Sequence, residues 1–80
     1  MNNVKMYLEG PGRERRPVKL VSTEEASIDV YSFAEHSAIR RPIEINVLAD
    51  PAGNLARQVD HEGYRYKFTG SEVPWALIIG

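Results

Sequence analysis

The chain has no cysteine, and this absence limits how it can hold a fold together. Without disulfides or a thiolate zinc site, its 80 residues depend on packing alone. A domain of this size buries only about 60% of the surface that its unfolded chain exposes, so it has room for one hydrophobic core. The hydrophobic share of 42% is typical of globular proteins rather than of disordered chains. We therefore expect residues 1–80 to form a single globular domain.

Three segments in the second half of the chain alternate apolar and polar residues with the period of two that is typical of a half-buried strand. They are residues 43–47, 55–59 and 64–68. Asp50 and Gly53 in the first connection, and Gly63 in the second, are residues that favour tight turns. This pattern predicts an antiparallel meander. The apolar run over residues 75–79 predicts a further strand at the C-terminus.

Two more strands are expected near the N-terminus, over residues 4–8 and 18–21. Gly10 and Gly12 end the first of them, and an arginine-rich stretch leads into the second. If the two strands pair, the residues between them form a long charged hairpin loop.

The segment between the two halves carries the end signals of a helix. Ser22 followed by Glu25 matches a capping box, in which the two side chains satisfy free amides of the first helical turn. Arg40 and Arg41 suit the negative end of a helix dipole, and Pro42 ends a helix. These signals predict a helix over residues 23–39.

Residues 28–33 also favour the opposite interpretation, because they are rich in the β-branched and aromatic side chains that are typical of strands. On the end signals, we predict an α+β fold: an antiparallel sheet of about five strands with one helix packed on it, in the order β-β-α-β-β-β. The C-terminal run is a candidate sixth strand. The alternative is an all-β barrel or roll, which holds if residues 27–34 are a strand.

The sequence contains no arrangement that indicates catalysis or cofactor binding. His36 and His61 are the only imidazoles, and neither has a second ligand at metal-binding spacing. Gly10 and Gly12 are not followed by the lysine and hydroxyl of a phosphate-binding loop. We therefore expect no enzyme activity, no metal and no cofactor.

Function is instead predicted by elimination, as a small protein-binding module that acts as an adaptor, an inhibitor of a larger complex or an assembly component. Arginine is enriched at protein interfaces because its planar group makes paired hydrogen bonds and stacks on aromatic rings. The candidate partner-binding residues are Arg13, Arg15, Arg16, Arg40, Arg41 and Trp75. The alternative is a nucleic-acid-associated domain that uses the same arginines, although a net charge of −1 argues against broad attraction to phosphates. A small enzyme or enzyme subunit is the third hypothesis.

Both faces of the C-terminal strand are apolar, because Trp75, Leu77 and Ile79 alternate with Ala76 and Ile78. We expect something to cover the second face, either another protein or a second copy in a homodimer. Nothing in the sequence matches a secretory signal or the roughly 20 apolar residues that cross a bilayer. The expected location is therefore the cytoplasm.

Overall fold

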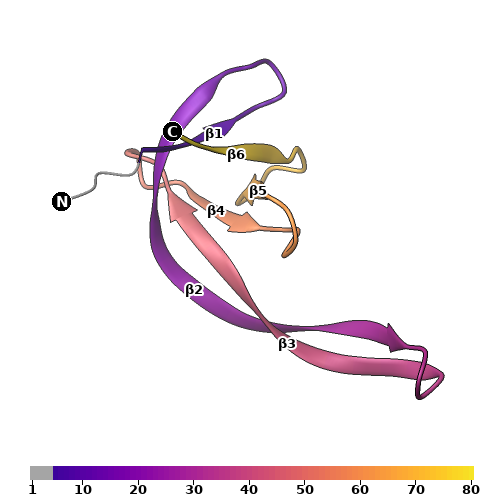
Figure 1. The fold of residues 1–80 in the computed structure, drawn as a ribbon. Coiled ribbons are helices and arrows are strands. Elements are labelled where there is room, and N and C mark those ends of the chain that lie inside the picture. Colours follow the sequence, from indigo (N-terminus) through magenta and orange to yellow (C-terminus); the bar gives the residue numbers. More distant parts are fainter. Residues whose placement is uncertain (1–4) are drawn as a thin grey trace.

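The chain folds into β-strands, whose side chains point alternately into and out of the sheet. The computed structural model describes residues 5–80, and in this part of the chain every regular element is a strand. The strands are β1 (Met6–Glu9), β2 (Arg15–Ser32), β3 (Ser37–Ala49), β4 (Leu55–Gln58), β5 (Arg65–Phe68) and β6 (Trp75–Ile79). Each pairs antiparallel with the next, and β6 pairs back with β1, so the sheet closes into a barrel (Figure 1).

The barrel is filled by the inward-facing residues of all six strands. Its buried cluster consists of Leu8, Val18, Leu48, Ala56, Tyr66, Phe68 and Trp75, with Met6 and Leu77 packed against it. The rings of Phe68 and Trp75 meet edge to face, with their centroids 5.2 Å apart. Gly10 lies against the Trp75 ring, where a Cβ atom would come within 2.9 Å of it. Glycine at this position therefore lets the β1–β2 loop close over the core.

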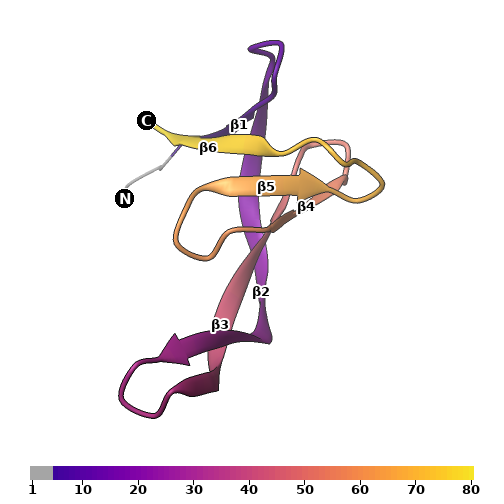
Figure 2. The same ribbon diagram turned by 90° about the vertical axis from the view of Figure 1, so that its right-hand side faces the viewer.

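β2 and β3 continue far beyond the barrel as a two-stranded hairpin (Figures 1 and 2). The register of this pair shifts between Leu20 and Ser22, a β-bulge at the point where β2 leaves the barrel. Bulges bend a strand and increase its twist, which directs the hairpin away from the barrel axis. We call residues 22–46 the arm. It ends in a turn over residues 33–36, in which His36 has the left-handed φ of 51°.

The predicted α+β fold is wrong, and the all-β barrel that the sequence left as the alternative is correct. Residues 23–39 are not a helix: they form most of the arm and its turn. Ser22 pairs with Val47 in the ladder instead of capping a helix. The physical reason is that residues 26, 28 and 30 form an alternating apolar pattern in which Ile28 and Val30 are β-branched. This strand preference outweighs the helix end signals once β3 offers a partner strand.

The other end signals of that helix also have different roles in the structure. Arg40 and Arg41 lie in β3, opposite Asp29 and Ile28 of β2. Pro42 is accommodated inside β3 because β3 pairs only with β2 along the arm, and proline is tolerated in edge strands.

The meander of the second half is confirmed, since β3, β4 and β5 pair in order and β6 follows. The first strand also forms, although Val4, at the start of its expected range, lies outside the part of the chain that the structure describes.

Candidate protein-binding surface

The arm has one apolar face and one polar face, because directly opposed residues of a ladder point to the same side. Its apolar face consists of Ala26, Ile28 and Val30 from β2 with Ile39, Ile43 and Ile45 from β3. Two charged side chains share this face: Arg41, opposite Ile28, and Glu24, opposite Ile45 at the barrel end, where it pairs with Arg57 at 2.7 Å. The other face carries mainly polar and charged pairs, such as Asp29 with Arg40, which are joined at 3.3 Å.

Nothing else in residues 5–80 packs over the distal part of this apolar face. The side chains of the face are only partly buried, and Val30 keeps 39% of its surface exposed. Near the barrel, Ile28, Ile43 and Ile45 line a groove of about 300 Å³ together with Val59 and His61 beyond the end of β4. The apolar face therefore begins as one wall of a groove and continues as an open surface toward the end of the arm.

Two aromatic side chains, Tyr31 and Phe33, lie at the end of the arm. We call this end, residues 31–36, the tip. Phe33 begins the turn and is 83% exposed. Its ring meets that of Tyr31 edge to face at a centroid distance of 5.0 Å. An exposed phenyl ring held by a neighbouring ring is unfavourable in water, so the tip is well suited to entering an apolar pocket of another molecule.

The arginines predicted to bind a partner lie in two separate regions. Arg13, Arg15 and Arg16 belong to the β1–β2 loop and the start of β2, at the barrel, whereas Arg40 and Arg41 lie along the arm. Arg13 adopts the left-handed φ of 62° in the loop, and Arg15 forms an ion pair with Glu9 at 3.3 Å. The structure therefore does not bring the five arginines together into one patch.

Arg16 and Trp75 are both predicted to bind a partner, but in the structure they contact each other at the barrel. Trp75 is buried, with 7% of its surface exposed. The guanidinium of Arg16 lies 5.0 Å from the Trp75 ring centroid and 4.9 Å from that of Phe68. Cations at this distance from aromatic faces are held by the ring quadrupole. Both residues thus have a structural role in closing this end of the barrel.

β6 uses both of its hydrogen-bonding edges within the barrel, one with β1 and the other with β5. A second copy cannot add to either edge while the barrel is closed. The homodimer through this strand stays a prediction, and it would have to use exposed side chains such as Ile79 at the end of β6, which is 57% exposed.

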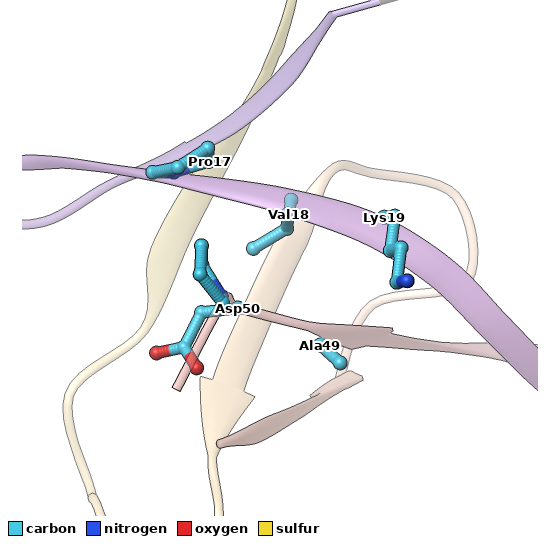
Figure 3. Close-up of a pocket in the computed structure, with 6 residues that line it drawn as sticks. Pro17, Val18, Lys19, Ala49 and Asp50 are labelled. Atoms are coloured by element: carbon cyan, nitrogen blue, oxygen red, sulfur yellow. The ribbon is translucent and has the colours of Figure 1, made fainter. Parts of the chain in front are cut away.

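A second apolar hollow lies at the barrel end of the β2–β3 ladder. It has a volume of about 290 Å³ and is lined by Pro17, Val18, Lys19, Ala49, Asp50 and Pro51. We call it the socket. Figure 3 shows the carboxylate of Asp50 directed away from Pro17 and Val18. The volume of the socket is at the low end of the range for ligand pockets, and its walls are mainly apolar.

Asp50 is the buried acid of the described chain, and its hydrogen bonds explain how a carboxylate is tolerated there. The backbone and side-chain amides of Asn54 donate to it at 2.8 and 3.0 Å, and Arg16 donates at 3.4 Å. The Asn54 side-chain hydrogen bond is the main reason why the pKa of Asp50 is lower than its usual value, with backbone amides and Arg16 adding to it against the effect of burial. Asp50 therefore stays ionised and fixes the turn over residues 50–54.

We expect Asn54→Ala to raise the pKa of Asp50 toward its ordinary value, as an NMR titration of the carboxyl carbon would measure. A lowered folded-state pKa contributes stability above the unfolded-state pKa, and that contribution is lost as the pH falls through the folded-state value. The variant should therefore show a smaller loss of stability on acidification than the parent. Asn46→Ala is the control, since its side chain makes no hydrogen bond to Asp50. An unchanged Asp50 pKa in Asn54→Ala would contradict this explanation.

In residues 5–80 no three histidine or acidic side chains gather to hold a metal ion. The same residues contain no helix long and apolar enough to cross a membrane.

Sequence reasoning missed the apolar face, although the signal for it was present. The alternation at residues 26, 28 and 30, repeated at 43 and 45, is visible in the sequence but was assigned partly to a helix. Comparison of the chain with protein-family models, curated proteins and solved structures finds no match.

Proposed function

We propose that this chain is a small non-enzymatic protein-binding module and that the arm is its binding element. The observation that supports the proposal is the uncovered apolar face of the arm. At about 3.3 Å per residue over roughly nine residues, and about 10 Å across two strands, this face covers on the order of 300 Å². Apolar patches of that size on a small monomer are often functional.

The stability of the arm supports the same conclusion. A two-stranded hairpin is marginally stable in water by itself, and a third layer that covers its apolar side is what normally stabilises it. The arm has no such layer beyond the groove near the barrel. A partner protein that packs on the apolar face would supply it.

Charge argues against the nucleic-acid alternative as the role of the arm. Residues 22–46 contain five carboxylates and two arginines, a net charge of −3. A phosphate backbone would be repelled by this surface. The arginines Arg15, Arg16 and Arg40 are also engaged in ion pairs with acids of the same chain.

The proposal is tested by placing a photo-crosslinking residue on either face of the arm in the host cell. A crosslinker at Ile28, on the apolar face, is expected to give a discrete protein adduct. The matched control is Ser27, one residue away on the polar face. A crosslinker there should give little adduct, because adjacent strand residues point to opposite sides.

Equal adducts from both positions would show that the arm meets other proteins only at random. No adduct from either position would show that the apolar face is not covered in the cell. Either result would overturn the assignment of the arm as a binding element.

A further inference from the structure

We infer that the partner of the arm is a second copy of this chain, held head to tail, with the tip of one copy in the socket of the next. This inference rests on the proposed function and identifies the molecule that the arm binds. It concerns two features that lie on the same chain but cannot meet within it.

The distribution of charge favours contact between the arm of one copy and the barrel of another. The arm has a net charge of −3, whereas the rest of the chain has eight cations and six carboxylates, a net charge of +2. Two arms packed together would place two segments that each have a net charge of −3 side by side. An arm on a barrel brings opposite charges together, and complementary potentials both steer association and select the arrangement.

The tip and the socket are complementary in chemistry as well as in charge. The tip offers the exposed phenyl ring of Phe33, with Glu35 two residues further along the turn. The socket has apolar walls and Lys19 at its edge. Among residues 5–80, Lys19 has no carboxylate within ion-pairing distance, whereas Asp50 is already held by Arg16 and Asn54. The socket thus has one cation free to meet an acidic tip.

The length of the arm prevents a chain from filling its own socket. The ladder runs from the pair of Lys19 and Ala49, at the socket, to the pair of Ser32 and Ser37, at the tip. This is roughly 40 Å of strand at about 3.3 Å per residue. Figure 1 shows the turn of the β2–β3 hairpin at the far end of the molecule from the barrel.

In the head-to-tail arrangement each pair of copies makes one tip-to-socket contact, which leaves one free tip and one free socket. Such a heterologous contact continues until the chain of copies closes into a ring or extends as a filament. The expected assembly is therefore larger than a dimer.

The test uses the purified full chain and light scattering over a wide concentration range. The parent is expected to exceed the mass of two chains as concentration rises. Phe33→Ala removes the tip, and Lys19→Glu reverses the charge at the socket; both side chains are exposed, so the barrel should fold. Each variant alone is expected to raise the dissociation constant by about 30-fold or more, which is the effect of losing a central anchor residue. At concentrations at which the parent assembles, each variant should keep the monomer mass of 9.0 kDa.

Mixing the two variants is the decisive measurement. Phe33→Ala keeps an intact socket and Lys19→Glu keeps an intact tip, so an equimolar mixture should form a dimer and nothing larger. Tyr64→Ala and Lys67→Glu are the matched controls, because they remove an exposed aromatic and reverse a cation elsewhere on the barrel. Both controls should assemble like the parent.

Three results would overturn the inference: a parent that is monomeric at every concentration, controls that fail as badly as the two variants, or a mixture that stays monomeric. The last would indicate a symmetric contact rather than a head-to-tail one. A monomeric parent that still crosslinks from residue 28 to a different protein would remove self-assembly and leave the proposed function in place. A parent that is monomeric and also gives no crosslink from residue 28 would overturn both the inference and the proposed function.

Discussion

Trp75→Ala is expected to destabilise the barrel by about 4 kcal/mol, within the range of about 3–5 kcal/mol for truncating a large buried aromatic side chain. Trp75 is almost fully buried, meets Phe68 edge to face and supports the guanidinium of Arg16. A domain of this size has a total stability of about 5–15 kcal/mol, so this loss is a large share of it. Much of the population should be unfolded at moderate temperature.

Urea denaturation followed by circular dichroism measures this loss, because Trp75 is the only tryptophan and its fluorescence disappears in the variant. Trp75→Phe is the control, since it keeps an aromatic ring in the core and should cost less. The sequence predicted Trp75 as a partner-binding residue. If that role were its main one, Trp75→Ala would retain the stability of the parent and lose only the partner.

Removing the arm is expected to abolish association while the barrel remains folded. The variant replaces residues 23–46 with Asn-Gly, a pair that favours the tight turn of a two-residue hairpin between Ser22 and Val47. All seven residues of the buried cluster lie outside the deleted segment. The remaining chain of about 58 residues is within the range in which small domains still fold by themselves.

Thermal unfolding and light scattering test the two halves of this expectation separately. The variant should unfold cooperatively, and it should stay monomeric at every concentration at which the parent assembles. A non-cooperative transition would mean that the arm is part of the folding unit. A variant that assembles like the parent would mean that the association surface is on the barrel alone.

The sequence alone determined the parts of the fold that depend on local pattern. Residues 55–58, 65–68 and 75–79 alternate, or form a short apolar run, between strong turn signals, and they are strands in the structure. Within the alternating segment 64–68, the rings of Tyr66 and Phe68 face the core, whereas Tyr64 precedes β5 and is exposed. Period-two patterns of this kind need no distant partner to be recognised, because side chains of a strand alternate in every sheet.

Whether residues 23–39 form a helix or strands was decided only by the tertiary structure. Their capping and dipole signals describe a helix in isolation, whereas their β-branched residues describe a strand that requires a partner. β3 is that partner: it pairs with β2 from Ser32 and Ser37, next to the turn, to Lys19 and Ala49 at the barrel, so the outer pairs join residues far apart in the chain.

The sequence could predict that the chain has a protein-binding surface, but not where on the fold that surface lies. The enrichment of arginine pointed to the β1–β2 loop, yet Arg16 is held against Phe68 and Trp75, and this contact exists only because the barrel closes β6 onto β1. The apolar face of the arm likewise needs the register of β2 with β3, which places Ala26 beside Ile43 and Val30 beside Ile39. Local pattern determines which residues alternate, whereas only packing determines which of the resulting faces remains uncovered.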